Sequence, residues 1–175
     1  MEKLTIVSKQ YILLASIHCS ENSRIKTLFD VYYKIYPAYI EIEYSDSEFI
    51  IHFENQQYHY SYSDINKITL SICGRRATIR QQYLLTLHID LCNGMSLEIE
   101  TFDYEEAIHF YENAKANKVE AIETNNITSI VNKHLNDLRQ MYDLIEKNAD
   151  TFFKDHPQDK KRLDFTRNTL NRYNK

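Results

Sequence analysis

Apolar and polar residues alternate with a period of two through the middle of the chain. Runs of this kind, rich in β-branched and aromatic residues and separated by polar turns, are typical of strands that bury one face. The pattern predicts six strands, with these apolar positions: Ile40, Ile42 and Tyr44; Phe49, Ile51 and Phe53; Tyr58, Tyr60 and Tyr62; Ile68, Leu70 and Ile72; Leu85, Leu87, Ile89 and Leu91; and Met95, Leu97 and Ile99.

The strand register can be predicted, because a slip by one residue would move a whole apolar face into water. In the last hairpin, a three-residue loop, Cys92–Gly94, keeps the apolar faces together and puts Gly94 in the left-handed conformation. That loop pairs Leu91 with Met95, Ile89 with Leu97, and Leu87 with Ile99. The same rule pairs Tyr44 with Phe49, Ile42 with Ile51 and Ile40 with Phe53 in the first hairpin, and Phe53 with Tyr58, Ile51 with Tyr60 and Phe49 with Tyr62 in the second.

Helical spacing follows the strands. Asp103 is predicted to cap a helix that has acidic residues in its first turn, and we expect this helix to close over the sheet. Its apolar face comprises Ala107, Phe110, Tyr111 and Ala114.

From about Thr124 the apolar positions recur alternately four and three residues apart, which predicts one helix of some five turns. The stripe comprises Ile127, Val131, His134, Leu138, Met141 and Ile145. Pro157 is suited to the first turn of a further helix, so the C-terminus is interpreted as a helical hairpin. Near the N-terminus, Leu4–His18 predicts one or two strands and Ser23–Tyr36 a helix.

The fold class predicted is therefore α+β, with an antiparallel meander sheet closed by a helix. Residues 1–118 would form the sheet-plus-helix domain with an N-terminal extension, and residues 119–175 the helical hairpin. The apolar stripe must be buried against another surface. We expect it to pack on its own domain, with a homodimer through residues 124–174 as the alternative.

Composition places the chain among globular proteins, since 43% of its 175 residues are hydrophobic and no apolar run approaches the roughly 20 residues of a membrane span. The apolar run Tyr11–Ile17 lacks the features of a signal peptide, so the cytoplasm is the expected location. Cys19, Cys73 and Cys92 are odd in number and widely spaced, which predicts buried free thiols.

Charge is unevenly distributed although the net charge is only −4. Glu41–Asp64 holds six acidic residues and no Lys or Arg, and Tyr83–Ala114 holds seven acidic residues and again none. Lys154–Lys175 holds seven basic and three acidic residues. This distribution indicates either ordinary solubility or a basic tail that docks on an acidic sheet face, in the same chain or in a second copy.

One candidate metal site follows from the predicted register. It places Glu41 opposite His52 and His52 opposite His59, in a row across three strands on the face away from the core. Side chains in such a row lie about 5 Å apart, within reach of a shared metal ion. The alternative is a solvated polar face, because zinc sites usually need three or four ligands with further support.

A second polar group pairs His88 with Glu98 and Asp90 with Ser96. Cys92 shares the face of His88 by period two, but its place in the turn is too far away for His88 to act as its base. The chain also lacks a glycine-rich phosphate loop, a paired-carboxylate motif and a nucleophile elbow. We therefore expect neither an enzyme nor a cofactor.

Arg75, Arg76 and Arg80 lie in the segment Gly74–Gln82, which is interpreted as a loop between two strands. Three arginines at a hairpin tip could bind phosphate or carboxylate groups. The candidates are a lipid head group at a membrane surface, nucleic acid, or an acidic protein surface, and a solvated loop is the alternative. Nucleic acid is disfavoured, because the acidic strands would repel its phosphates.

Three segments together resemble bacterial pleckstrin-homology-like domains: Tyr62-Ser63-Asp64-Ile65-Asn66-Lys67-Ile68, then Leu91-Cys92-Asn93-Gly94, then Asp103-Tyr104-Glu105-Glu106-Ala107-Ile108-His109-Phe110-Tyr111. The resemblance covers roughly residues 39–118. It implies a sheet closed by a helix and a binding or scaffolding module without chemistry, and it names no ligand.

The function predicted is a non-catalytic protein–protein interaction module, either an adaptor or a neutralising, immunity-type protein. The basis is the absence of catalytic motifs, the acidic sheet and the fourteen tyrosines. The alternative is an anion-binding module that uses the three arginines at a membrane surface or on nucleic acid.

Overall fold

The computed structural model describes residues 11–19, 40–53, 55–77 and 80–154. In this part of the chain, eight strands form one sheet in the order β4-β3-β2-β1-β7-β6-β5-β8. The strands are β1 (Tyr11–Cys19), β2 (Ile40–Tyr44), β3 (Glu48–Phe53), β4 (Gln56–Ser61), β5 (Ile65–Ala77), β6 (Arg80–Leu91), β7 (Ser96–Thr101) and β8 (Glu120–Glu123). Together with the helices below they make the mixed α+β fold that the sequence predicts.

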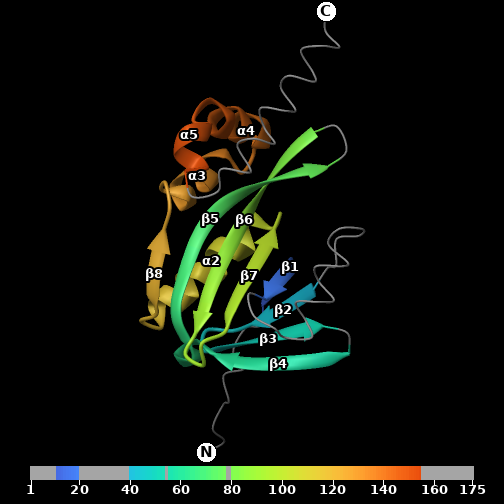
Figure 1. The fold of residues 1–175 in the computed structure, drawn as a ribbon, viewed down its shortest axis with the longest axis vertical. Helices are drawn as coiled ribbons and strands as arrows, with labels where there is room; N and C mark the ends of the chain where they lie inside the picture. Colours follow the sequence, from blue (N-terminus) through green and yellow to red (C-terminus); the bar gives the residue numbers. More distant parts are fainter. Residues whose placement is uncertain (1–10, 20–39, 54, 78–79, 155–175) are drawn as a thin grey trace, which may run out of the picture.

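β1 joins the two halves of the sheet. Its first residues pair with β2, where Tyr11 lies opposite Tyr44, and its last residues pair with β7, where Ser16 lies opposite Glu100. In Figure 1, β3 and β4 run across the direction of β5, β6 and β7. The sheet therefore bends at β1, and its two halves enclose one core of apolar side chains that includes Leu13, Ile42, Phe49, Leu70, Leu87 and Ile99.

The predicted registers of the first and last hairpins are confirmed. Ile89 lies opposite Leu97 and Leu87 opposite Ile99, and the Leu91 amide donates to the Met95 carbonyl at 2.8 Å. Gly94 has a φ of 87°, as the three-residue loop requires. In the first hairpin, Tyr44 pairs with Phe49 and Ile42 with Ile51.

The predicted register of the second hairpin is wrong by two residues. Ile51 lies opposite Tyr58, not Tyr60, and Phe49 lies opposite Tyr60. The connection is shorter than expected, because Asn55 adopts a left-handed φ of 64° just before β4 begins. A slip of two keeps every residue on its predicted face, so the apolar pattern does not distinguish the two registers.

Tyr62 is not a strand residue but begins the short 3-10 helix η1 (Tyr62–Asp64). Its ring is buried beside Phe49 and Phe110, with ring centroids 5.9 and 5.7 Å away. Ser61 and Asp64 form a capping box, in which each side chain accepts a backbone N–H of the opposite end. The capping box ends β4 and turns the chain toward β5.

The helix predicted after the sheet is α2 (Tyr104–Ala116), and Asp103 stands at its N-cap position without a side-chain hydrogen bond. The predicted apolar face, with Ala107, Phe110, Tyr111 and Ala114, is buried. Phe110 packs edge-on against Tyr44 and Phe49. α2 therefore covers the inner face of the sheet, as expected (Figure 1).

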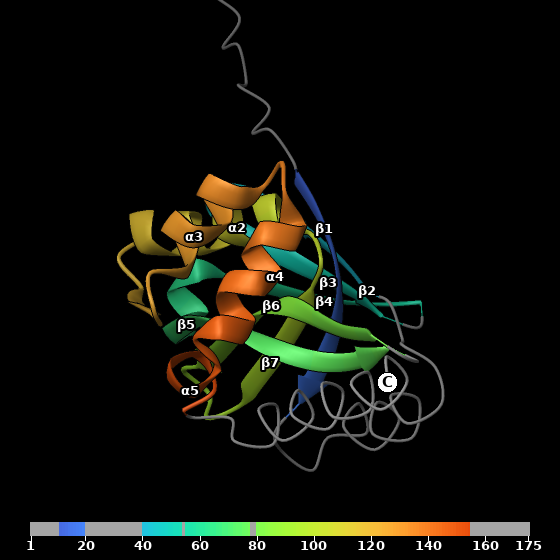
Figure 2. The same ribbon diagram turned by 90° about the horizontal axis from the view of Figure 1, so that it is seen from above.

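The single long helix expected after Thr124 is wrong. The structure has α3 (Ile127–His134), α4 (Leu138–Lys147) and α5 (Ala149–Phe152). α3 ends at His134, and Asp137 starts α4, because its carboxylate accepts the Gln140 amide at 3.1 Å as an N-cap. Figure 2 shows α2, α3 and α4 grouped beside the sheet.

The apolar stripe of these helices is buried in the same core as the sheet, through Ile127, Val131, Met141, Ile145, Ala149 and Phe153. The second arm of the predicted hairpin, the predicted helix Ser23–Tyr36 and the basic segment after Lys154 lie outside the described residues. β1 overlaps the predicted strand region Leu4–His18 and ends one residue beyond it, at Cys19. The strand β8, which pairs in parallel with β5, was not expected from the sequence.

Candidate functional site at the open edge of the sheet

The two ends of the sheet are β4 and β8, and among the described residues no strand pairs with the outer side of either. An unpaired strand edge presents a row of backbone N–H and C=O groups that can pair with another chain. Proteins usually protect such edges with charges, proline, bulges or very short strands. The two edges are therefore compared by these features.

β8 has the features of a protected edge. It is four residues long and two of them are carboxylates, Glu120 and Glu123. The chain leaves it at once, since the Thr124 amide and hydroxyl both donate to the Leu70 carbonyl at the end of the ladder. The Glu123 carboxylate accepts the Thr128 amide at 2.6 Å and so fixes the start of α3.

β4 has none of this protection. Its six residues, Gln-Gln-Tyr-His-Tyr-Ser, include no Asp, Glu, Lys, Arg or Pro. Its ladder with β3 is continuous over six pairs, from Glu48 and Ser61 to Phe53 and Gln56. Tyrosine is also a residue that strongly favours strands.

The hydrogen-bond alternation identifies which β4 residues face outward. Just beyond the ladder, the Tyr62 amide donates to the Ser47 carbonyl at 3.2 Å. In an antiparallel pair, bonded and non-bonded positions alternate along the strand. The backbone groups of Tyr60 and Tyr58, which are two and four residues before Tyr62, therefore bond to β3. Gln57, His59 and Ser61 then direct their backbone groups to the open side. Ser61 agrees with this, because its amide donates outward to the Asp64 carboxylate at 2.7 Å.

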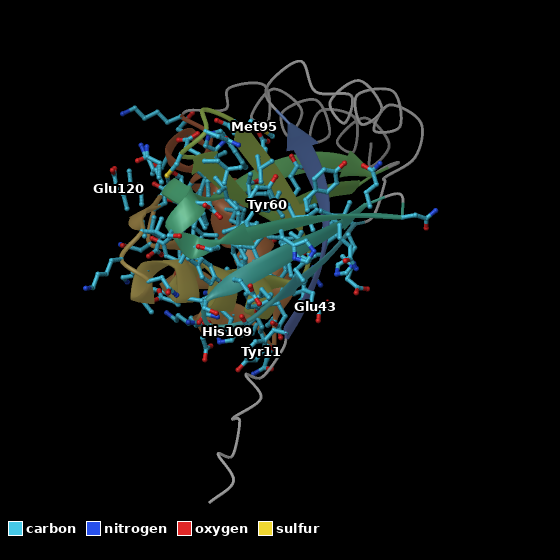
Figure 3. All side chains as sticks on the ribbon, turned by 90° about the horizontal axis from the view of Figure 1, so that it is seen from below. Tyr11, Glu43, Tyr60, Met95, His109 and Glu120 are labelled. Atoms are coloured by element: carbon cyan, nitrogen blue, oxygen red, sulfur yellow. The ribbon has the colours of Figure 1, made fainter. Side chains whose placement is uncertain are left out.

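The open edge therefore offers the backbone N–H and C=O groups of Gln57 and His59, and Asp64 closes its Ser61 end. On the core side of the edge lie Tyr58 and Tyr60, both partly buried. The Tyr60 ring stacks on Phe49 with centroids 5.2 Å apart, and Figure 3 shows Tyr60 on the strand that crosses the view. We call β4, with these backbone groups and the two tyrosines, the β4 edge.

The surroundings of the β4 edge are acidic. Glu41, Glu43 and Glu48 lie on the face of β2 and β3 that points away from the core, and Glu41 and Glu48 are exposed. Glu43 contacts His52, with 3.2 Å between its Oε2 and the His52 Nε2. Figure 3 shows Glu43 on this half of the molecule, well away from Glu120 at the β8 edge.

The predicted metal row forms only in part. Glu41 does lie opposite His52, but Gln57 occupies the position predicted for His59, which lies opposite Ile50. His52 instead contacts Glu43 and, at 3.5 Å, the Gln57 amide nitrogen. Within the residues that the structure describes, no group of three or more His, Cys, Asp or Glu side chains could hold a metal ion.

The interpretation of Gly74–Gln82 as a loop is wrong. β5 and β6 pair without interruption up to Ala77 and Arg80, so only residues 78–79 connect them. Arg75 lies opposite Gln82 and Arg76 opposite Gln81. Because faces alternate along a strand, positions 75 and 80 fall on one face of this hairpin and position 76 on the other. The three positions therefore lie in the last three pairs before the connection, as predicted for a hairpin tip, but they are divided between its two faces.

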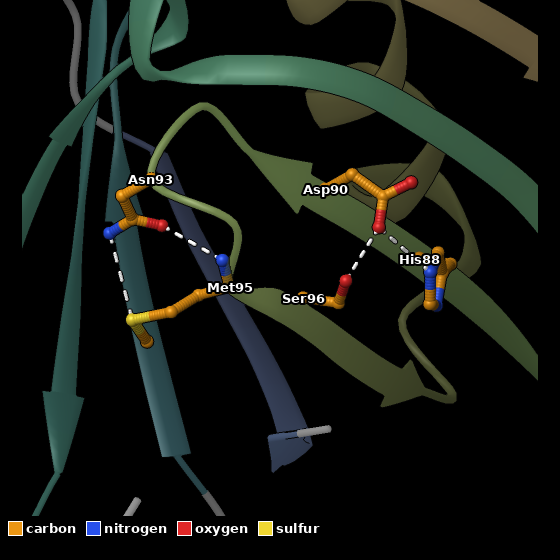
Figure 4. Close-up of polar contacts among 5 residues, drawn as sticks. All are labelled: His88, Asp90, Asn93, Met95 and Ser96. Atoms are coloured by element: carbon orange, nitrogen blue, oxygen red, sulfur yellow. Dashed lines mark hydrogen bonds and ion pairs between the residues drawn. The ribbon is translucent and has the colours of Figure 1, made fainter. Parts of the chain in front are cut away.

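His88, Asp90 and Ser96 come together on the outer face of β6 and β7 (Figure 4). His88 Nε2 lies 3.2 Å from Asp90 Oδ1, and the Ser96 hydroxyl donates to the same oxygen at 2.6 Å. A nucleophilic triad needs the histidine between the hydroxyl and the carboxylate. Here the carboxylate stands between the other two, so these contacts do not activate Ser96.

Cys92 is in the turn, as predicted, and its thiol contacts the Ser63 carbonyl at 3.7 Å. It is exposed, which contradicts the expectation of a buried thiol, whereas Cys73 is buried as expected. Beside Cys92, the Asn93 side chain accepts the Met95 amide at 3.0 Å and donates to the Met95 sulfur (Figure 4). These contacts stabilise the tight loop.

A partly buried polar cluster attaches α2 to the sheet. The Tyr44 hydroxyl donates to the Glu106 carboxylate and lies 3.1 Å from His109 Nδ1. Since the single hydroxyl proton goes to Glu106, His109 Nδ1 is the donor in the second contact. Burial, and then the hydrogen bond and charge of Glu106, raise the pKa of Tyr44. Tyr11 packs edge-on against His109, and the two lie side by side in Figure 3. The cluster has a structural role.

A scan against protein-family models found no match, and searches of curated proteins and of solved structures found none. No helix of the described residues is long and apolar enough to cross a membrane. The assignment of a site therefore depends on the chain's own geometry. Sequence reasoning missed the β4 edge, because an open edge is a property of strand order and has no local motif.

Proposed function

We propose that this protein is a non-catalytic protein-interaction module, of the adaptor or neutralising type, that binds an extended segment of a partner protein along the β4 edge. The observation that carries the proposal is the contrast between the protected β8 and the unprotected β4, whose Gln57 and His59 backbone groups face outward. Adding a strand to such an edge is a common mode of peptide recognition.

The proposal includes a pleckstrin-homology-like architecture. The order β4-β3-β2-β1-β7-β6-β5, the bend at β1 and the closing helix α2 support this resemblance. In this arrangement β8 already occupies the outer side of β5. A partner strand therefore finds its place at β4.

The test uses a proline at position 59. The His59 amide faces the open side, so His59→Pro removes a donor for the partner strand and no bond to β3. The matched control is His59→Ala, which removes the side chain and keeps the amide. Peptides are selected from a random-sequence display library against the full chain, and their Kd for each variant is measured by fluorescence anisotropy.

We expect His59→Pro to weaken the selected peptides by about tenfold or more, equivalent to about 1.4 kcal/mol, and His59→Ala to weaken them far less. In the bound state, the amides of Gln57 and His59 should become protected from hydrogen exchange, while those of Tyr58 and Tyr60 are protected throughout. A library that yields no binder, or binders equally tight on both variants, would overturn the proposal.

A further inference from the structure

The stretch of sequence that forms β2, β3 and β4 is acidic. Glu41–Asp64 contains six acidic residues and no Lys or Arg. Interactions between charges extend over a Debye length of about 8–10 Å at physiological ionic strength. Neighbouring strands lie about 4.8 Å apart. A strand added beside β4 would therefore be about two strand spacings from β3, and its charges would lie about one Debye length from the carboxylate of Glu48.

Three acidic residues lie near the Ser61 end of the β4 edge. Glu48 lies opposite Ser61, and Asp64 binds the Ser61 amide. Asp46 adjoins Ser47, whose carbonyl accepts the Tyr62 amide. All three carboxylate-bearing residues are exposed. At the other end of β4, Asn55 and Gln56 are neutral, and Glu54 precedes them in the sequence.

The two faces of the added strand would meet different surfaces. On the outer face its side chains would lie beside Gln57 and His59, near the carboxylates. On the core face they would lie beside the partly buried rings of Tyr58 and Tyr60. Alternate residues of a strand point to opposite faces. The occupant that fits both faces therefore alternates basic and apolar residues.

We infer that the partner of the β4 edge is an extended segment in which Lys or Arg alternates with apolar or aromatic residues. This inference rests on the proposed function and adds the chemistry of the partner. Pairing of β4 with β4 of a second copy does not supply it, because β4 and the whole of Glu41–Asp64 contain no Lys or Arg.

The experiment compares two short synthetic peptides, one alternating lysine with valine and one alternating glutamate with valine. Each is titrated into the full chain at low and at physiological ionic strength, with binding followed by fluorescence anisotropy. We expect the lysine peptide to bind at least about tenfold more tightly, with a difference that shrinks as salt is added.

Variants test whether the carboxylates near the β4 edge cause the preference for the lysine peptide. The double variant Asp46→Asn and Glu48→Gln should remove most of the difference between the two peptides. Glu120→Gln, on the β8 edge, is the matched control and should leave it unchanged. Equal binding of both peptides, or a preference that the double variant leaves intact, would overturn the inferred chemistry.

The His59→Pro variant separates this inference from the proposed function. Loss of lysine-peptide binding in His59→Pro, with retention in His59→Ala, supports pairing at β4. Unchanged binding in His59→Pro would overturn the docking site even if the charge preference persists. Concentration-dependent dimerisation that His59→Pro abolishes, without peptide binding, would make a second copy the occupant and overturn the inference.

Discussion

The strands at the two ends of the sheet, β4 and β8, differ in length, in charge and in the element that comes next along the chain. β8 has four residues, two of them acidic, and leads directly into α3. β4 has six uncharged or weakly basic residues and an outer side on which, among the described residues, no strand lies. Among the described residues, the chain therefore protects one edge by the usual means and not the other, and this contrast is the basis of the proposed function.

The largest expected effect is on the free energy of unfolding. It compares a proline placed in β5, which has a strand on each side, with a proline placed in β4, which has one neighbouring strand among the described residues. The Leu70 carbonyl accepts the Thr124 amide on the β8 side, so the neighbouring Thr69 directs its N–H toward β6. Thr69→Pro should therefore lose a ladder hydrogen bond and reduce the free energy of unfolding by about 3 kcal/mol or more.

His59→Pro loses no bond to β3 and should cost less than about 1 kcal/mol. Urea denaturation of both variants, followed by circular dichroism, measures the two losses. Equal losses would mean that the His59 amide is bonded within the fold, and β4 would then not be an open edge.

The comparison also shows what the sequence could predict. The β6–β7 register was predictable because Gly94 and the apolar positions on both sides of it agree on one loop length. The β3–β4 register was not, because a slip of two residues preserves both faces and also pairs Phe49 with a tyrosine. What decides it is Asn55 in the turn and the burial of Tyr62 under Phe110, a contact with a residue far along the chain.

Other differences between the predicted and the observed fold also arise from contacts between segments that are distant in the sequence. Gly74–Gln82 is too polar to suggest strands, yet β5 and β6 continue through most of it as a paired ladder. β8 is short, and its parallel partner β5 lies some fifty residues earlier, so no local pattern predicts the pairing. The β4 edge is known only once the strand order is known, although its lack of charge is visible in the sequence.

A smaller effect is expected where β4 ends. Asp64 accepts the Ser61 amide at 2.7 Å, and Ser61 accepts the Ser63 amide at 3.0 Å. Asp64→Ala removes half of this capping box and should lower the free energy of unfolding by about 1 kcal/mol. Asp64→Asn keeps an acceptor oxygen and should cost less. Urea denaturation measures both.

The same substitution should also lengthen the open edge, because it releases the outward-facing Ser61 amide. Hydrogen exchange at Ser61 should become faster in Asp64→Ala than in the wild type. If exchange at Ser61 is unchanged, another group satisfies this amide, and the end of the β4 edge is set by something other than Asp64.

The smallest expected effect is on the pKa of a buried tyrosine. It compares Tyr111, near the β8 edge, with Tyr62, near the β4 edge. Burial raises the pKa of Tyr111, and the nearby charges of Glu123 on β8 and of Glu112 raise it further. Burial also raises the pKa of Tyr62, at the end of β4, where the nearby side chain of Asn113 opposes the effect and the charge of Asp46 adds to it. Both phenols should remain neutral in the folded protein at a pH that ionises an ordinary tyrosine.

Above a pH of about 10, the unfolded chain loses these protons while the folded chain keeps them, so the free energy of unfolding falls as the pH rises. Glu123→Gln removes one negative charge near Tyr111 and keeps an oxygen that can accept the Thr128 amide. It should lower the pKa of Tyr111 toward the ordinary value and leave Tyr62 unchanged. NMR titration of labelled tyrosine rings measures both residues in one sample, with Tyr111→Phe to assign the signal. An equal shift at Tyr62 would mean that the charge of β8 acts across the whole sheet, and the electrostatic separation of the two edges would be lost.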